Sequence, residues 1–338
     1  MLTKLFLAIS FLCCSFTITA QQKRFSFSQP KMGSPFNIIF YYDDSLKANL
    51  LAKQCFSLVD SFVYIFSDYI DSSELMKLNG SAGFNPKPVI LSPALFDILL
   101  LSKYAYEQSK GTCDITVGAL VKLWRKARKT KQFPTDDEVQ ATLKLIGFNK
   151  LNIDTINKTV TLLSSGMQLD LGGIAQGYIA QKVLNFLTNQ HINKALINVS
   201  GDIVMSDAPP NTTGWSVGIN VPETKDELLP KTLIMHNKAV TTSGDAYQFM
   251  EHNGKKYSHI VNPKTGYGII SQKNVTVIAN NGTMADWLTK ACSILPIKKA
   301  KKLAKKLGAE VLITQIKNGR IRYHATKGFA LYWKQVPL

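Results

Sequence analysis

LDLGGIAQGY, residues 169–178, is the stretch that decides the architecture. It begins as an apolar strand that ends on Asp170, turns through Gly172 and Gly173, and continues into a helix near 175–187. A glycine pair lets the backbone approach a ligand closely, and free N–H groups at a helix start attract an anion. Glycine pairs before helices also serve tight packing alone, so both interpretations stay open for this segment by itself.

The sequence around this stretch mixes helix-like and strand-like segments without a regular strand–helix–strand repeat. Apolar residues at helical spacing predict helices at 46–66 and 93–108, and Thr135 followed by Glu138 predicts a capped helix over 135–145. The mixture predicts an α+β fold. The strand-like segments are 36–42, 160–163, 195–199, 215–221, 232–235, 256–261, 275–279 and 310–314.

The first twenty residues have the pattern of an export signal. Lys4 supplies a positive charge, Leu5–Phe16 is apolar but too short to span a bilayer, and Thr17–Ala20 ends on a small residue. We therefore expect residues 1–20 to be a signal peptide and the protein to be exported, to the periplasm. Lipidation at Cys13 or Cys14 and retention of the segment as a membrane anchor are the alternatives.

Composition excludes several classes of protein. With 338 residues, of which 45% are hydrophobic, the chain can bury a sizeable core. After signal removal, Cys55, Cys113 and Cys292 are too scattered for a zinc site or a disulfide framework, so buried free thiols are expected.

The net charge of +17 includes a cluster of lysines: Lys298, Lys299, Lys301, Lys302, Lys305 and Lys306. Apolar residues recur between them at helical spacing, which predicts a solvated helix face. Peripheral contact with an anionic membrane is the alternative for this face. The chain has no nucleic-acid-binding motif, so no nucleic-acid partner is expected.

Three further motifs contain residue types that bind ligands or take part in catalysis. Residues 241–244 read TTSG and are followed by Asp245, and residues 257–266 read YSHIVNPKTG. His259 is expected in a strand just before a turn, where it serves either structure or function. In MADWLTKA, residues 284–291, Asp286 lies near a helix start, where a carboxylate either favours the helix dipole or binds a hard cation such as Mg²⁺.

Together with other segments, these motifs resemble the FAD:protein FMN transferase (ApbE-like) family. The match runs from Met32 to about Phe329, and it implies one domain over residues 21–338, of one lobe or two, with mostly antiparallel sheets in a T-fold-like architecture. The other matching segments are MGSPF (32–36), FSDY (66–69), SEL (73–75), LN (78–79), DITVG (114–118) with Leu120, Leu123 and Trp124, and NVSGD (198–202).

The resemblance implies an enzyme that cleaves FAD at its pyrophosphate, attaches FMN to a Thr or Ser hydroxyl of a partner protein, and releases AMP with the assistance of Mg²⁺. Such a site must neutralise two linked phosphates, aim a hydroxyl in line and accept its proton. Two alternatives are an FAD-binding protein with little or no transferase activity and a Mg²⁺-dependent FAD pyrophosphatase, in which water replaces the acceptor.

The same resemblance assigns roles to residues. His259 is implied as the base or phosphate ligand, and Asp286 as a catalytic carboxylate that binds metal together with the carbonyl oxygen of Gly173 and the position of Lys290. The flavin contacts implied are Met32, Tyr69, Cys113, Asp114, Asp170, Gln176 and the backbone around Val261.

Lys290 is the departure from the family that matters most, because it stands where the family has a metal-binding Thr. An ammonium cannot ligate magnesium, and at i,i+4 it can pair with Asp286 on one helix face. Thr289 is turned away by about 100°. We therefore expect weak magnesium binding and at least partly metal-independent FAD binding. The alternative is that Lys290 extends to solvent and that Thr289 or a water molecule completes the metal site. Other departures are Ala119 for Pro, Gln176 for Lys, Gln181 for Asp, Ser200 for Gly and Asn262 for Asp.

Overall fold

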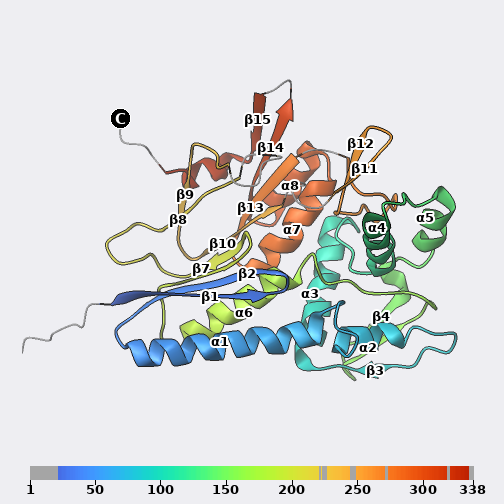
Figure 1. Ribbon diagram of the computed structural model, residues 1–338, viewed down its shortest axis with the longest axis horizontal. Coiled ribbons are helices and arrows are strands. Elements are labelled where there is room, and N and C mark those ends of the chain that lie inside the picture. Colours follow the sequence, from blue (N-terminus) through green and yellow to red (C-terminus); the bar gives the residue numbers. More distant parts are fainter. Residues whose placement is uncertain are drawn as a thin grey trace, which may run out of the picture.

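The computed structural model describes residues 22–220, 222, 227–243, 249–270, 273–317 and 320–334. The expected signal peptide and Asp245 lie outside the described residues. The predicted α+β class is confirmed, because helices pack on an antiparallel sheet of eight strands (Figure 1). In spatial order these strands are β1 (Lys23–Lys31), β2 (Ser34–Tyr42), β6 (Ala195–Val199), β7 (Asp202–Met205), β10 (Lys238–Ser243), β13 (Lys273–Ala279), β14 (Glu310–Lys317) and β15 (Arg320–Ala325).

The two faces of this sheet carry different cores because side chains alternate along each strand. Val275 and Val277 face the larger core, whereas Ile278 faces the smaller one. The larger core packs under helices α1 (Ser45–Phe66), α3 (Pro93–Ser109), α6 (Ala175–Asn189), α7 (Gly282–Ile294) and α8 (Ile297–Lys306). The smaller core is covered by β8 (Trp215–Val217), β9 (Leu233–Met235) and the 3₁₀ helix η2 (Lys327–Tyr332).

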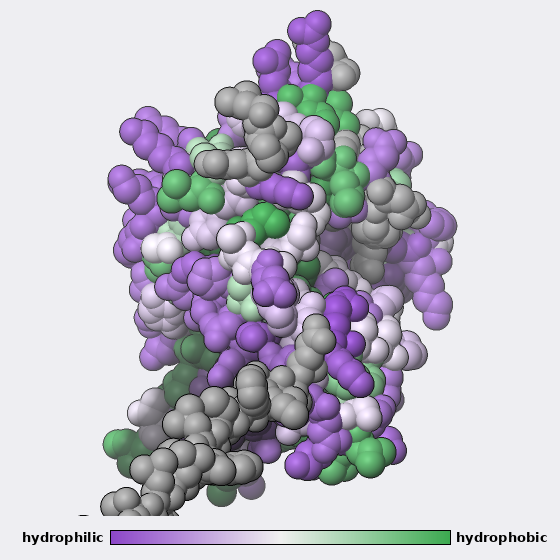
Figure 2. Space-filling model, turned by 90° about the vertical axis from the view of Figure 1, so that its left-hand side faces the viewer, coloured by the Kyte–Doolittle hydropathy of each residue, from purple (hydrophilic) through white to green (hydrophobic). Residues whose placement is uncertain are grey.

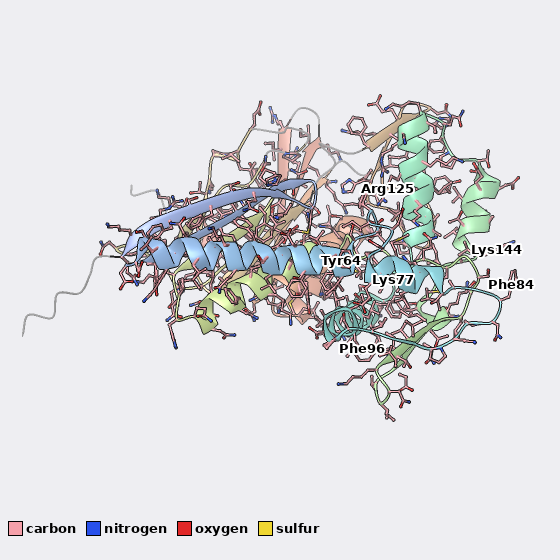
Figure 3. All side chains as sticks on the ribbon, turned by 60° about the horizontal axis from the view of Figure 1, so that its bottom comes forward. Tyr64, Lys77, Phe84, Phe96, Arg125 and Lys144 are labelled. Atoms are coloured by element: carbon pink, nitrogen blue, oxygen red, sulfur yellow. The ribbon has the colours of Figure 1, made fainter. Side chains whose placement is uncertain are left out.

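A second group of elements lies together at one end of the molecule, on the right in Figure 1. It contains α2 (Glu74–Gly80), α4 (Gly118–Thr130), α5 (Asp136–Leu143), the 3₁₀ helix η1 (Phe148–Lys150) and a three-stranded sheet of β3 (Val89–Ile90), β5 (Thr159–Leu162) and β4 (Leu151–Asp154). The hairpin β11 (Phe249–His252) and β12 (Lys255–Ser258) adjoins it. Figure 3 shows Phe84 at the outer edge of this end, and its side chain is fully exposed.

Local capping explains α5. The Thr135 hydroxyl accepts a hydrogen bond from the Glu138 N–H at 3.2 Å, and the Glu138 carboxylate accepts one from the Thr135 N–H at 2.8 Å. This capping box satisfies amide groups that the first helical turn leaves without partners. The predicted start of this helix is therefore confirmed, and the helix ends at Leu143, two residues before the predicted end.

The expectation that His259 lies within a strand is wrong. Strand β12 ends at Ser258, and His259 follows in a bend. The Ser258 hydroxyl accepts a hydrogen bond from the Ile260 N–H at 3.1 Å, which turns the chain at this point.

No helix in the described part of the chain is long and apolar enough to cross a membrane. Hydrophilic residues cover most of the face drawn in Figure 2, and hydrophobic ones form small separate patches there. On α8, Ala300, Leu303 and Ala304 are buried while Lys298 and Lys305 are exposed, as its spacing predicts. Cys55 and Cys292 are buried free thiols, as expected, and Cys113 is a free thiol that is only partly buried.

Candidate active site

A cavity of about 240 Å³ brings distant parts of the chain together. Its wall comes from the segment after α1, the segment before α4, one face of α4, the turn before α6, the segment after β12 and the end of α7. The site residues expected from sequence that line this cavity are Tyr69, Cys113, Asp114, Asp170, Gly173, His259, Val261 and Lys290.

Three expected site residues do not line the cavity. Met32 forms the tight turn between β1 and β2 with Gly33, where the two φ angles are 53° and 74°. Gln176 lies half-buried in the first turn of α6. Asp286 is wholly buried and lies behind the wall, in contact with Lys290.

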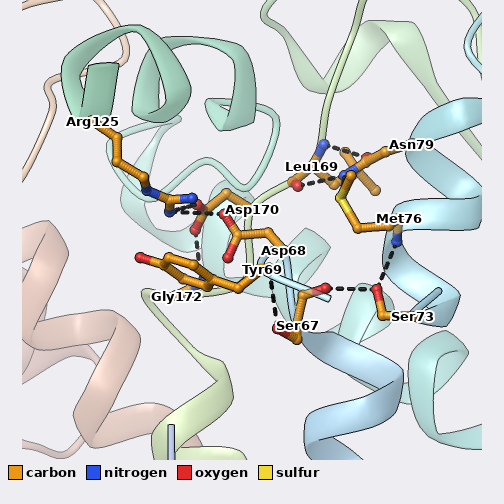
Figure 4. Close-up of polar contacts among 10 residues, drawn as sticks. All are labelled: Ser67, Asp68, Tyr69, Ser73, Met76, Asn79, Arg125, Leu169, Asp170 and Gly172. Atoms are coloured by element: carbon orange, nitrogen blue, oxygen red, sulfur yellow. Dashed lines mark hydrogen bonds and ion pairs between the residues drawn. The ribbon is translucent and has the colours of Figure 1, made fainter. Parts of the chain in front are cut away.

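The position of Asp170 is fixed by hydrogen bonds on both sides (Figure 4). The side-chain amide of Asn79 donates to the Leu169 carbonyl at 3.0 Å and accepts from the Leu169 N–H at 2.7 Å. The Asp170 N–H donates to the Ile115 carbonyl at 2.8 Å. The Asp170 carboxylate then accepts from the Gly172 N–H at 2.8 Å, which closes the turn that leads into α6.

The segment after α1 is held in the same way. The Ser73 hydroxyl donates to the Ser67 carbonyl at 2.6 Å and accepts from the Met76 N–H at 3.0 Å, so one side chain both ties the loop and caps α2. The Tyr69 N–H donates to the Ser67 hydroxyl at 3.1 Å. These bonds hold Tyr69 at the cavity with 75% of its surface exposed (Figure 4).

Arg125 connects these two parts of the wall. Its guanidinium nitrogen lies 2.8 Å from Asp68 and 3.9 Å from Asp170, and its central carbon lies 4.1 Å from the centre of the Tyr69 ring. Figure 3 shows Arg125 on α4, and Figure 4 shows its approach to Asp68 and Asp170. Two charge contacts and one cation–π contact leave the guanidinium little freedom.

Sequence reasoning assigned no role to Arg125, to Asp68 or to Arg128, which also lines the cavity. A signal was present, since Val121, Arg125 and Arg128 follow the i, i+4, i+7 spacing of one helix face.

The segment that carries His259 is docked onto α4 by a tryptophan. The Trp124 indole N–H donates to the Gly266 carbonyl at 2.7 Å, and Trp124 itself is buried. Within the turn, the Gly266 N–H donates to the Asn262 carbonyl at 2.9 Å, and the Asn262 N–H donates to Tyr267 at 2.9 Å. These bonds fix the loop beside the cavity and hold His259 at its wall.

Burial raises the pKa values of two carboxyl groups and one thiol group at the cavity wall. It raises the pKa of Asp170 to about 6, and the charge of Asp68 adds to this shift while the Gly172 N–H and Arg125 oppose it. Burial also raises the pKa of Asp114, against two hydrogen bonds from Thr116. The pKa of Cys113 is raised to about 12, chiefly by burial, so this thiol stays protonated at neutral pH.

Two glycines allow α6 and α7 to cross closely. A Cβ atom on Gly177 would lie 2.2 Å from the Gly282 carbonyl oxygen, and one on Gly282 would lie 2.5 Å from the Gly177 carbonyl oxygen. This approach lets the Gly177 N–H donate to Asp286 Oδ2 at 3.0 Å. Gly177 in the first turn of α6 and Gly282 at the start of α7 therefore serve a close helix contact.

Lys290 occupies the other oxygen of Asp286. Its Nζ lies 2.9 Å from Asp286 Oδ1, in an ion pair. Its Cγ lies 3.3 Å from where a Cβ on Gly173 would stand, so the lysine stem runs alongside that glycine. The lysine side chain is partly exposed, and Lys290 lines the cavity.

A second buried carboxylate, Asp202 of β7, contributes to the same group of charges. Burial raises the pKa of Asp202 to about 7, and the charge of Asp286 adds to this shift while Lys290 opposes it. Burial alone would lower the pKa of Lys290, but the charges of Asp286 and Asp202 raise it above its ordinary value. Thr289 donates instead to the Ala285 carbonyl at 2.5 Å and is fully buried. In the described part of the chain, no group of three or more His, Cys, Asp or Glu side chains is arranged to hold a metal ion.

Residues 32–313 match the ApbE family. The FAD:protein FMN transferase of Klebsiella pneumoniae (strain 342) is 31% identical over 268 residues, which cover 78% of this chain and 81% of that protein. The FAD:protein FMN transferase of Treponema pallidum (strain Nichols) is 29% identical over 262 residues, covering 73% of this chain and 72% of that protein.

Solved structures share the fold. The flavin transferase ApbE from Vibrio cholerae matches with a TM-score of 0.81 at 23% identity, over 92% of this chain and 99% of that one. The apo form of the Pseudomonas stutzeri flavinyl transferase ApbE matches with a TM-score of 0.80 at 23% identity, over 92% of this chain and 97% of that one. The expected mostly antiparallel architecture is thereby confirmed.

Proposed function

The chain belongs to the ApbE family, and we propose that it is an FAD:protein FMN transferase whose active site is the cavity lined by His259, Asp170 and Lys290. The donor is FAD, and the acceptor is a Thr or Ser hydroxyl of a partner protein. In the reaction, the hydroxyl oxygen bonds to the phosphorus of the FMN half, the bond from that phosphorus to the AMP phosphate oxygen breaks, and the hydroxyl proton passes to a base.

One observation carries this proposal. Segments far apart in the sequence, each of which resembles a family motif, meet at the wall of a single cavity. They are the segments of Tyr69, Asp114, Asp170, His259 and Lys290. Hydrogen bonds through Asn79 and Trp124 hold two of these segments, those of Asp170 and His259, in place, and such support is what a site needs to orient its substrate.

We assign His259 the role of base or phosphate ligand, because it lines the cavity on a segment held by α4. Tyr69, Cys113, Asp114, Asp170 and Val261 are proposed flavin contacts because they line the same cavity. Gln176 and Met32 do not line it, and we propose no contact with the flavin for them.

The family resemblance implies magnesium at Gly173, Asp286 and position 290. The arrangement of Asp286 argues against this ion: one oxygen accepts from the Gly177 N–H and the other is paired with the Lys290 ammonium. Magnesium takes oxygen ligands in near-octahedral geometry, and an ammonium beside its carboxylate repels it. The residues present therefore do not fit the ion, and we assign no step to it.

We further propose that residues 1–20 direct export and that residues 21–338 form one flavin transferase domain, which acts outside the cytoplasm. The charge pattern of the first residues and the family match over 32–313 support these two proposals. Contact of the α8 lysines with an anionic membrane stays an expectation.

The function is tested by incubating the purified protein with FAD and a library of synthetic Thr- and Ser-containing peptides, and by measuring AMP, free FMN and peptide-bound flavin. We expect AMP and peptide-bound flavin in equal amounts. Equal AMP and free FMN would instead indicate a pyrophosphatase, and FAD bound without AMP would indicate a binding protein.

His259→Ala should lower the rate of AMP release by about 100-fold or more, as expected when a general base is removed. His236→Ala is the matched control, because His236 is an exposed histidine that does not line the cavity. A His259→Ala variant as active as the control would contradict the role assigned to His259.

A further inference from the structure

A positive charge supplied by the chain itself stands at the wall of the cavity. Lys290 Nζ lies 2.9 Å from Asp286 Oδ1, and the charge of Asp202 also acts on it. Asp286 is wholly buried and Asp202 is buried, whereas the lysine side chain is partly exposed and reaches the cavity. The lysine is thus paired with Asp286 behind the wall, under the added charge of Asp202, and its side chain lines the cavity.

The surroundings keep Lys290 in this position. Its stem runs alongside Gly173, where a side chain would crowd Lys290 Cγ at 3.3 Å. If the ammonium turned out to solvent, Asp286 would be a buried charge held by the Gly177 N–H without the lysine beside it. A buried carboxylate without its partner is strongly unfavourable, so the ion pair resists displacement.

The hydroxyl of Thr289, the residue before Lys290, does not take the place of the lysine ammonium. Thr289 donates its hydroxyl hydrogen to the Ala285 carbonyl within α7 and is fully buried. A divalent cation at Asp286 would therefore have to displace the ammonium and gain no hydroxyl from Thr289 in exchange.

We propose that the Lys290 ammonium is the resident cation of this site and contacts the FAD pyrophosphate in place of a divalent metal ion. An ammonium binds phosphate oxygens directly, as a point charge with three N–H donors. The inference rests on the proposed function for the identity of the ligand, and it predicts that FAD binding does not depend on divalent metal.

The first test uses the wild-type protein and measures FAD affinity by quenching of flavin fluorescence, in EDTA and again in excess Mg²⁺. The expected dissociation constants agree within about threefold, because the phosphates meet the same ammonium in both conditions. A loss of affinity of more than about tenfold in EDTA overturns the inference.

The second test uses Lys290→Thr, with Lys182→Thr as the matched control. Lys182 also pairs with an aspartate, Asp97, at 3.1 Å, but does not line the cavity. In EDTA, Lys290→Thr should bind FAD about 10- to 100-fold more weakly, as expected for the loss of a charged hydrogen bond, and Mg²⁺ should restore binding. The control should bind FAD like the wild type in both conditions.

Unchanged binding by Lys290→Thr in EDTA, or equal losses in both lysine variants, would overturn the inference. If Lys290→Thr fails to fold, Lys290→Met retains the stem without the charge and should bind FAD weakly with or without Mg²⁺. Wild-type-like binding by Lys290→Met would also overturn it.

These readouts separate the inference from the proposed function. Metal-independent FAD binding with no AMP release would refute the transferase and leave the resident cation intact. Transferase activity in Mg²⁺ together with loss of FAD binding in EDTA would refute the resident cation and leave the proposed transferase intact.

Discussion

Gly177→Ala should disturb the site from behind, through the crossing of α6 and α7. The added Cβ would lie 2.2 Å from the Gly282 carbonyl oxygen and 2.7 Å from Asp286 Cβ. Gly282 O is a backbone atom, so a flexible side chain cannot relieve the contact. The two helices must move apart, and the Gly177 N–H must leave the Asp286 carboxylate that it meets at 3.0 Å.

The magnitude follows from two costs. Overpacking a close contact costs about 1–3 kcal/mol, and losing a hydrogen bond to a charged group costs about 1.5–3 kcal/mol. Because the helices relax in one movement, the two costs overlap, and we expect a loss of unfolding free energy of about 3 kcal/mol. That is a large share of the stability of an ordinary domain, which is about 5–15 kcal/mol.

Urea unfolding followed by circular dichroism measures this loss, with Gly80→Ala as the control. A Cβ on Gly80 meets nothing within 4 Å, and Gly80 lies in helix α2 as Gly177 lies in α6. FAD affinity should also fall in Gly177→Ala, because displacement of Asp286 moves Lys290. If the unfolding free energy of Gly177→Ala lies within about 0.5 kcal/mol of that of the control, and the two variants bind FAD equally well, the close helix crossing does not support the site.

Two other predictions concern Asp170 in the cavity wall and Trp124, which holds the loop beside the cavity. Because Asp170 has a pKa of about 6 when folded against an ordinary 3.8, the folded protein binds its proton more tightly than the unfolded chain does. The free energy of unfolding of the wild type, relative to that of Asp170→Asn, should be highest below about pH 4 and should fall by about 3 kcal/mol as the pH rises to about 6. A difference in urea unfolding that stays constant over that range would contradict the raised pKa of Asp170. Trp124→Phe leaves the buried Gly266 carbonyl without its donor and should lower unfolding free energy by about 1–3 kcal/mol, and a variant as stable as wild type would show that this bond does not hold the loop.

Local patterns predicted the elements whose stability is local. The apolar spacing of α1 and α3, the capping box of α5 and the apolar run of β6 all lie within their own segments, and the structure contains each of them. The helix α4 was not predicted, because its start at Val117 has no side-chain cap. What orders it is tertiary: the turn at Gly118 packs against residues 168–169, and Trp124 bonds to Gly266.

The same distinction holds for the candidate site. The pairing of Asp286 with Lys290 was predicted from the sequence because both residues lie on one helix, four positions apart. The charge of Asp202 on that pair was not predicted, since Asp202 belongs to a strand and nothing in its own segment points toward α7. Arg125 was missed for the same reason: its partners Asp68 and Asp170 come from two other segments.

A resident ammonium and a divalent ion would stabilise the pyrophosphate to different extents. At equal distance and dielectric, a single charge attracts each phosphate oxygen with about half the Coulomb energy of a double charge. The ammonium is, however, held in place before FAD arrives, because it is already paired with Asp286, so binding does not require ion capture. The expected consequence is FAD binding that is insensitive to chelators, together with slower pyrophosphate cleavage than a site with a bound divalent ion would give. The rate of AMP release should therefore rise, in the presence of Mg²⁺, when Lys290 is replaced by Thr, even though FAD affinity in EDTA falls.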